Sequence, residues 1–264
     1  MLDIKSAFDH TFGNEVHDKR KLSLSYAALG VLESESLILH KIGAGMAKAR
    51  GVDKKHATKQ VDRLLSNPAY DIWDLSSIWV PHVIGCKKEV MVSLDWSSFS
   101  GDEQDTLALN LISNKFSSTP LLWKTVEHKR LKNNRARYED QMLSKLKEAM
   151  PKDVVVTLVA DRGFADQKFF KFIEEELGFN YIIRFKKGTY ISNDKGEEKT
   201  AGEWANENGH AKSMKNVLFT KDNYPLKLVV LVKDKDMKDE WNLASNIENS
   251  SSRIIIKAYA KRWK

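Results

Sequence analysis

The run VVVTLVAD, residues 154–161, limits the folds open to this chain more than any other stretch. It is apolar at nearly every position, follows Pro151 closely and ends in an acid just before Gly163. A continuous apolar run of this length is typical of a strand that is buried on both faces of a sheet, with helices covering it. The chain is therefore expected to fold around a central sheet of the α/β class.

The segments on either side of this run predict the order of the other elements. Strand-like runs begin at Glu89, in EVMVSLDWSSF, DTLALNLIS and TPLLWKTVEHK, and a helix is expected from about Arg135 to Met150. After the buried run come a second helix, in QKFFKFIEEEL, and the strand NYIIRFK. The predicted order is therefore three strands, a helix, a strand, a second helix and a final strand. This is the element order of a ribonuclease-H-like mixed sheet with flanking helices.

Residues 188–240 interrupt this order with a polar stretch that is rich in Lys, Glu and Asn. Two short strands are predicted within it, at 217–219 and 226–232, and the charged run KDKDMKDE follows them. We interpret this region as a β-rich insertion. The segment WNLASNI and a final helix, with a serine at 250–252 as its cap, follow it.

The region before Glu89 reads as helical and basic. Between Lys41 and Arg63 it has seven Lys or Arg against two acids, and two short helices meet near Gly51. A pair of helices with a positive face is typical of DNA-binding regions. A solvated face on an ordinary helical bundle is the alternative. The formal net charge of +7 also favours a polyanionic partner, because basic side chains that neutralise phosphates release counterions.

Composition excludes several classes of protein. The single cysteine, Cys86, rules out an intramolecular disulfide and a zinc site built from thiolates. No apolar stretch reaches 18 residues, and the amino terminus does not resemble a signal peptide. We expect a cytoplasmic protein with no membrane partner.

Two acids stand out by their positions in the predicted strands. Asp95 lies within the first strand of the sheet, and Asp161 ends the buried strand. A carboxylate among apolar residues is costly to desolvate unless it is paired or binds a metal, and Mg²⁺ prefers oxygen ligands. If the two strands are neighbours, both carboxylates can converge on one divalent cation, and a pair of such ions would support displacement at phosphorus. The alternatives are a capping role for Asp161 and an exposed edge position for Asp95.

A second basic segment, residues 124–137, follows the predicted hairpin. It has six Lys or Arg, including Lys132 and Arg135, against the single acid Glu127. A polyanion is expected to track along it, with a solvated loop as the alternative.

Four motifs in order resemble insertion-sequence DDE transposases of the IS-four family. They are SLDWSSF, VADRGFAD, WNLASNI and YAKRW, and the similarity extends to HATKQVDRLLSN at 56–67. The resemblance implies a helical DNA-binding region over 1–88, a ribonuclease-H-like catalytic core over 89–187, a β-rich insertion over 188–240 and the end of the core over 241–264. It also implies a transposase that uses a two-ion Mg²⁺ site, with Mn²⁺ as a substitute, held by Asp95 and Asp161 as catalytic residues.

The resemblance also assigns residues near the carboxyl end. Tyr259 and Arg262 match the first two positions of the family signature Y-x2-R-x3-E-x6-K, and its Glu would fall two residues beyond Lys264. We therefore expect a chain truncated just before its third catalytic acid and impaired in cleavage and strand transfer. Tyr259 and Arg262 would contact a phosphate, and Trp241 would stack on a base, with core packing as its alternative role.

The expected partners are double-stranded DNA, as element ends and target, and a second copy of the chain on paired ends. The residues expected to bind DNA are Tyr259, Arg262, Trp241, Lys55, Lys59, Arg63, Lys132 and Arg135. In a bacterial cell such a protein would associate with the nucleoid. A catalytically inactive DNA-binding remnant and a metal-dependent nuclease of similar fold are the other functions that these motifs allow.

Overall fold

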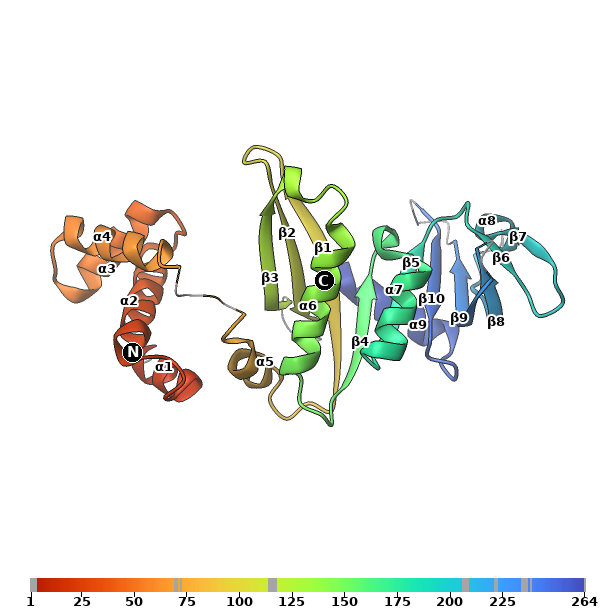
Figure 1. Cartoon of the computed structure of the whole chain (residues 1–264), viewed down its shortest axis with the longest axis horizontal. Helices are drawn as coiled ribbons and strands as arrows, with labels where there is room; N and C mark the ends of the chain where they lie inside the picture. The colour runs from red at the N-terminus through yellow and green to blue at the C-terminus, as the bar shows by residue number, and fades with distance from the viewer. Residues whose placement is uncertain are drawn as a thin grey trace. The chain divides into compact units, whose positions relative to one another are not determined.

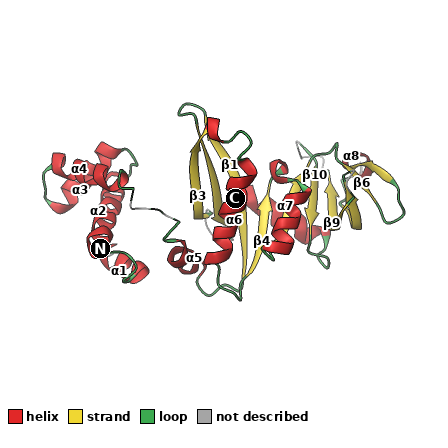
Figure 2. Cartoon of the chain, in the orientation of Figure 1, coloured by secondary structure: helices red, strands yellow, loops and turns green. Residues whose placement is uncertain are grey.

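The structure is a computed structural model that describes residues 4–68, 71, 73–113, 118–205, 209–220, 223–233, 237 and 239–263. The chain divides into two compact units, residues 1–82 and 83–264, and each is described by itself. Helices make up the first unit, and a long sheet with flanking helices makes up the second (Figures 1 and 2). Helix α5 (Ser76–Ile84) runs across the division between them.

The first unit contains four helices ahead of α5, which are α1 (Ile4–Phe12), α2 (Asp18–Ser34), α3 (Leu39–Arg50) and α4 (Lys54–Leu65). Its core lies around the fully buried Met46, Ala57 and Val61. The helices α2 and α3 approach closely because glycines face each other, and a Cβ on Gly45 would stand 2.5 Å from the carbonyl oxygen of Gly30. Larger residues at either position would force these helices apart.

Local backbone and side-chain features set the end of α3 and the start of α4. Helix α3 ends at Gly51, whose φ of 65° is the left-handed conformation that glycine adopts at little cost. Helix α4 begins at Asp53, whose carboxylate accepts a hydrogen bond from the His56 N–H at 3.0 Å.

Within the described residues no single helix is long and apolar enough to cross a membrane, although α2 and α3 together, bent by 98°, have the length and composition.

The second unit is built on one ten-stranded mixed sheet, in the order β3-β2-β1-β4-β5-β10-β9-β8-β6-β7. Its first five strands are β1 (Glu89–Phe99), β2 (Gln104–Leu111), β3 (Thr119–Glu127), β4 (Val155–Ala160) and β5 (Asn180–Phe185). The other five are β6 (Tyr190–Ser192), β7 (Glu198–Thr200), β8 (Lys212–Phe219), β9 (Tyr224–Val232) and β10 (Trp241–Ser245). Strands β1, β4 and β5 are parallel, and all the other pairings are antiparallel. The predicted buried run therefore lies at the centre of the parallel part, and its expected neighbour β1 does pair with it.

Helices cover both faces of this central part. They are α6 (Arg135–Ala149), α7 (Gln167–Lys171), which continues as a π-helical turn to Glu176, and α9 (Ser252–Ala260). On β5, Tyr181 stacks on Phe170 of α7, whereas the next residue, Ile182, packs in a cluster with Tyr259 of α9. Successive strand residues point to opposite faces, so α7 and α9 lie on opposite sides of the sheet. Figure 1 shows α6 and α7 in front of it.

Residues 188–240 contribute four strands and the short helix α8 (Ala201–Trp204), and these strands continue the same sheet beyond β10. The predicted strands at 217–219 and 226–232 lie within β8 and β9. Part of the charged run KDKDMKDE lies outside the described residues.

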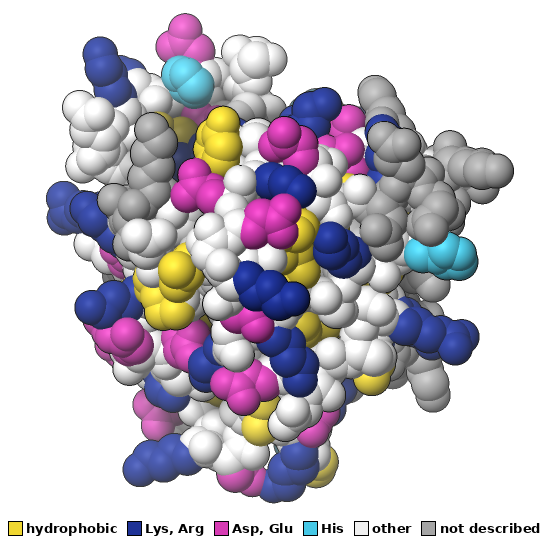
Figure 3. Space-filling view, turned by 90° about the vertical axis from the view of Figure 1, so that its right-hand side faces the viewer, with side chains coloured by type: hydrophobic (Ala, Val, Ile, Leu, Met, Phe, Trp, Pro, Cys, Tyr) yellow, Lys and Arg dark blue, Asp and Glu magenta, His cyan; other side chains and the backbone are white. Residues whose placement is uncertain are grey.

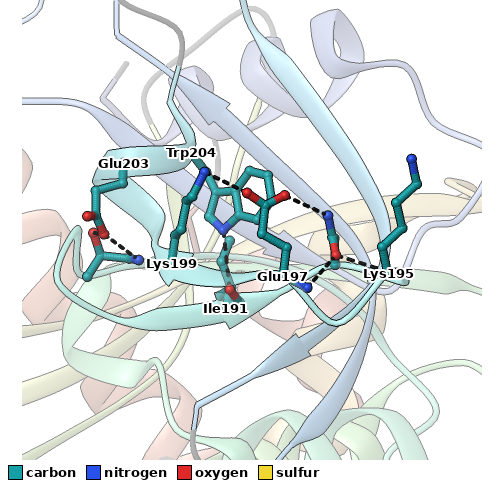
Figure 4. A network of polar contacts seen from close by, with 8 residues as sticks. Ile191, Lys195, Glu197, Lys199, Glu203 and Trp204 are labelled. Carbon is teal, nitrogen blue, oxygen red and sulfur yellow. Dashed lines mark hydrogen bonds and ion pairs between the residues drawn. The ribbon is translucent and has the colours of Figure 1, made fainter.

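One buried tryptophan fixes α8 against the hairpin of β6 and β7 (Figure 4). The Trp204 indole N–H donates to the carbonyl oxygen of Ile191 at 3.2 Å. The ammonium groups of Lys199 and Lys212 lie 5.1 and 4.5 Å from its ring centroid.

The edge strand β7 is only three residues long, and the end of the sheet that carries it shows interspersed basic and acidic side chains (Figure 3). A short and charged edge discourages pairing with another chain.

Three short 3-10 turns complete the fold: η1 (His128–Arg130), η2 (Arg162–Phe164) and η4 (Lys261–Trp263). The turn η2 comes directly after β4, and η4 comes directly after α9.

Candidate active site

The carboxylates of Asp95 and Asp161 lie side by side at one edge of the parallel strands. The register of β1 and β4 pairs Leu94 with Ala160, so the next residue on each strand is one of the two acids. Both side chains are partly open to solvent, with 51% of Asp95 and 32% of Asp161 exposed. The sequence prediction that these two strands are neighbours is thus confirmed.

The Arg262 side chain bridges the two carboxylates. Its Nη2 lies 3.1 Å from Oδ2 of Asp95, and its Nη1 lies 3.5 Å from Oδ2 of Asp161. Only 5% of the Arg262 side chain is exposed. A planar guanidinium suits this arrangement because its N–H groups reach two acceptors at once. One internal cation therefore offsets the charge of both acids.

Helix α9 places Arg262 there through Tyr259, one helical turn earlier. The Tyr259 hydroxyl accepts a hydrogen bond from Nη1 of Arg262 at 3.5 Å, and its ring is fully buried against Trp241, with centroids 5.0 Å apart. Burial raises the pKa of the Tyr259 phenol, and the negative charge of Asp161 adds to the rise. The phenol is therefore neutral. In this arrangement Tyr259 is buried in the core, and Trp241 is partly buried against it.

A second set of contacts fixes the rim of the site on the side of α6. Glu139, which is 6% exposed, accepts hydrogen bonds from Nε1 of Trp96 at 2.7 Å and from Nε of Arg135 at 3.0 Å. The Arg135 guanidinium lies 5.6 Å from the ring centroids of both Trp96 and Phe164. Arg135 is thereby held over the pocket that contains the two acids.

Asp161 also has the capping role that was the alternative interpretation. Its Oδ1 accepts from the Arg162 N–H at 2.6 Å at the start of η2, while its Oδ2 faces Arg262. Asp95 likewise accepts from the Trp96 N–H at 3.0 Å through Oδ1. Each carboxylate thus has one oxygen fixed by the backbone and the other directed to a shared cation.

The pocket around these groups has a volume of about 570 Å³. Its polar lining residues are Asp95, Trp96, Arg135, Asp161, Arg162, Asp166, Lys186 and Thr189. Asp166 also lines this pocket, and its Oδ1 accepts from the Lys168 N–H at 2.8 Å at the start of α7. In the part of the chain that the structure describes, no three His, Cys, Asp or Glu side chains gather as a metal site.

The other predicted DNA-binding residues lie in several places. Lys132 is exposed in the loop before α6 and does not line the pocket. Lys59 and Arg63 line a groove of about 620 Å³ in the first unit, whereas Lys55, also exposed on α4, does not. The groove is lined by Lys19, Arg20, Ser23, His56, Lys59, Gln60, Arg63, Leu64 and Asn67.

Sequence reasoning missed several of these residues. Lys19 and Arg20 of the groove belong to the run DKRK at 18–21, whose charge was visible but had no predicted partner. Glu139 was recognisable only as the residue four positions after Arg135 on the predicted helix. Nothing in the sequence indicated that Arg262 would face both acids.

Comparison with known protein families decides what this site belongs to. The family model described as Transposase DDE domain matches residues 112–264, which is more than half of the chain. The chain belongs to the DDE transposase family. The matched region of this transposase contains Asp161, Trp241, Tyr259 and Arg262, and Asp95 lies before its first residue.

Comparisons with individual proteins add little to the family assignment. No curated protein sequence matches this transposase significantly. It resembles two crystal structures of Marinitoga piezophila Argonaute, one with a 5′ OH guide RNA and one with guide RNA and target DNA. Each is 11% identical, with TM-scores of 0.29 and 0.28; the similarity covers 75% and 80% of this chain. The transposase spans only 31% and 30% of those chains, and TM-scores this low carry no argument about its fold.

Proposed function

We propose that this transposase binds the DNA ends of a mobile element and cleaves and joins its strands at the pocket of Asp95 and Asp161. One observation carries the proposal. Two acids on neighbouring parallel strands lie next to each other in register and share a single cationic partner, Arg262. Two partly exposed carboxylates that converge in this way offer the oxygen ligands that a divalent cation prefers.

The topology supports the same function. The element order that predicts a ribonuclease-H-like sheet is the observed order from β1 to β5, with α6 and α7 between the later strands. We propose that this half of the sheet is the catalytic core and that β6–β9 form an insertion that extends it. Asp161 follows the carboxyl end of β4, which is the usual position of ligand sites in open α/β sheets, and Asp95 lies beside it within β1.

The two carboxylates are a fitting donor set for Mg²⁺ or Mn²⁺. Both are oxygen ligands, both are partly exposed, and the charge that they already attract is positive. A bound divalent ion in such a site polarises a phosphate and activates a water molecule for attack. The protein's part is to hold the two acids in register and, with Arg135 and Arg162 at the rim, to orient a phosphate beside them.

Arg262 adds a step to this proposal. Its guanidinium pairs with the oxygens that a cation would need, so it has to turn away before the acids can hold one. Once released, its guanidinium would be free to contact a phosphate, as the family resemblance expects. Arg262 therefore links occupation of the acids to recognition of DNA.

We also propose that the groove between α2 and α4 binds the DNA backbone, and that two copies of the chain hold paired ends. Five basic or titratable cationic side chains line this groove: Lys19, Arg20, His56, Lys59 and Arg63. None of the described residues that line it is acidic. A surface of this kind neutralises phosphates and gains affinity by releasing counterions.

A second candidate function is a DNA-binding transposase that does not cleave. It is favoured by one observation, which is that no third acid joins Asp95 and Asp161 within the described residues. Two carboxylates balance less of the charge of two divalent ions than three do, so occupation of a second ion position would be low. Such a protein would hold ends, or form inactive mixed complexes with an active enzyme.

A strand-cleavage assay separates the two functions. The substrate is an end-labelled duplex that carries the DNA flanking the gene, incubated with Mg²⁺, Mn²⁺ or EDTA. Cleavage that leaves a 3′-hydroxyl and needs the metal supports the enzyme. Salt-sensitive binding without cleavage in either metal supports the second candidate, and a chain that neither binds nor cleaves this DNA contradicts both.

A further inference from the structure

A second pocket of about 620 Å³ opens beside the active-site pocket, and we call it the Asn242 pocket. It is formed by the end of β5, the segment after it and the start of β10. Its charged and amide side chains are Arg162, Arg184, Lys186, Lys187, Lys233, Asp239, Glu240 and Asn242. Its volume lies within the range of about 300–1,000 Å³ that is typical of small-ligand sites.

The walls of this pocket are predominantly positive. Arg184 is held in place, because its Nη2 donates to the backbone carbonyl of Glu240 at 3.0 Å and lies 3.6 Å from Asp239. Lys186, Lys187 and Lys233 form no ion pair with any residue that the structure describes. These three ammonium groups are therefore available to an anionic group.

The floor of the pocket contains two unused hydrogen-bond acceptors. Asn242 is 1% exposed, and its Oδ1 accepts no hydrogen bond from any described residue. Oε1 of Glu240, which also lines the pocket just before β10, is likewise buried and accepts no hydrogen bond from any described residue. Buried acceptors without partners reduce stability, so their presence in a pocket points to a ligand that donates to them.

A neighbouring asparagine shows the contrast. Oδ1 of Asn246 accepts from the Tyr181 N–H at 2.9 Å, and its Nδ2 donates to the carbonyl of Phe179 at 3.1 Å. Asn246 thus holds β5 in place, as structural asparagines do. Asn242 has no such use for its Oδ1 among the described residues.

The location of the pocket indicates what passes through it. Arg162, Lys186 and Thr189 line both this pocket and the active-site pocket, so the two are contiguous. Trp241 packs against Tyr259 on the α9 side, and the next residue, Asn242, faces the other side of the sheet. The Asn242 pocket is therefore separate from the surface on which Trp241 would stack a base.

We propose that the Asn242 pocket binds one nucleotide of an unpaired DNA strand that passes the active site, and that it prefers guanine. This inference rests on the proposed function. The lysines would hold the phosphates, while Oδ1 of Asn242 and Oε1 of Glu240 would accept from the base. Guanine presents two adjacent donors, N1–H and the 2-amino group, on its Watson–Crick edge. The other bases place an acceptor beside their donor, which a carboxylate would repel.

Fluorescence anisotropy with the full chain tests the preference. Three labelled single-stranded oligothymidylates are compared in EDTA, which prevents cleavage: one unmodified, one with a central guanine and one with inosine at that position. The guanine strand is expected to bind about tenfold more tightly than the unmodified one. The inosine strand, which lacks the 2-amino donor, should fall between them. Equal affinities for all three strands would overturn the proposal.

Two matched variants assign the preference to the pocket. Asn242→Leu removes the unpaired acceptor at nearly constant size, so it should abolish the guanine preference while the melting temperature stays equal or rises. Asn246→Leu, which removes an amide whose oxygen and nitrogen are both hydrogen-bonded, should lower the melting temperature and keep the preference. A guanine preference that survives Asn242→Leu would contradict the assignment. If that variant does not fold, Glu240→Ala serves instead, with the same expected loss.

Binding of duplex DNA, measured in the same buffer, keeps this inference distinct from the proposed function. Salt-sensitive duplex binding without any base preference would reject the pocket and leave the proposed function standing. A chain that binds neither duplex nor single strands would reject both. Lys186→Gln combined with Lys233→Gln should weaken all three strands by a similar factor, since phosphate contacts carry no sequence information.

Discussion

In the groove between α2 and α4, basic side chains line a surface with no acid among its described residues, whereas two acids share one buried guanidinium where the parallel pairing of β1 and β4 ends. The groove leaves its charge to be neutralised by a partner. The site neutralises its own charge internally, through a side chain from the last helix. Under the proposed function, we expect the groove to bind DNA without rearrangement and the two acids to bind a cation only after Arg262 moves.

This difference follows from where the residues lie in the fold. The groove residues come from exposed faces of two helices, where long side chains stay solvated and mutual repulsion is screened. The two acids lie beside a packed core, where an unpaired charge is costly, so the chain supplies a counter-ion. Weak and salt-dependent binding is expected of the first region, and selective binding of a small cation of the second.

The largest expected effect comes from removing one acid of the site. Asp95→Asn or Asp161→Asn should reduce metal-dependent cleavage more than about 100-fold, because loss of even an indirect metal contact costs about 10–100-fold. Duplex affinity, measured by anisotropy in EDTA, should stay within about twofold. Asp166→Asn, in the same pocket but occupied with capping α7, is the matched control and should retain most activity. Cleavage that persists without either Asp95 or Asp161 would remove both from the reaction.

A smaller effect of opposite sign is expected when the internal cation is removed. Arg262→Gln leaves both carboxylates without their counter-ion, so the variant should bind Mn²⁺ about tenfold more tightly in a titration followed by electron paramagnetic resonance. Charge-assisted hydrogen bonds contribute roughly 1.5–3 kcal/mol each, reduced here by the exposure of both acids, and tenfold corresponds to about 1.4 kcal/mol.

Arg262→Lys is the control for this substitution. It keeps the positive charge but not the planar fork, so its Mn²⁺ affinity should lie between those of the wild type and Arg262→Gln. The melting temperature of Arg262→Gln without metal should fall, because two carboxylates lose their partner. An unchanged Mn²⁺ affinity would mean that Arg262 does not compete with the cation.

How far the sequence predicts this molecule also differs between the two regions. The apolar run at 154–161 and the alternating strands predict the order of elements correctly, because hydrophobic periodicity is a local property. The pairing of Asp95 with Asp161 follows from that order. The positions of Arg262 and of Asn242 do not, since they depend on how α9 and β10 pack against strands that lie far away in the sequence.

The groove between α2 and α4 is predicted from the sequence only in part. The positive charge of α4 is visible in the sequence, but its second wall, α2, is not, because no pattern indicates which helix packs beside it. For the same reason the sequence does not distinguish Lys55 from Lys59, although only Lys59 lines the groove. Charge composition thus predicts a polyanionic partner, while tertiary packing decides which side chains contact it.

The smallest expected effect tests this distinction within one helix. Lys59→Gln combined with Arg63→Gln should lower the slope of log affinity against log salt concentration by about 2 and weaken duplex binding about tenfold, since each phosphate contact contributes about 0.9 to the slope. Lys54→Gln combined with Lys55→Gln removes the same charge from exposed positions of α4 that do not line the groove. That control pair should change the slope by less than half as much. Equal effects of the two pairs would indicate diffuse attraction by the whole helix, and the groove would then be no more specific than any other basic face.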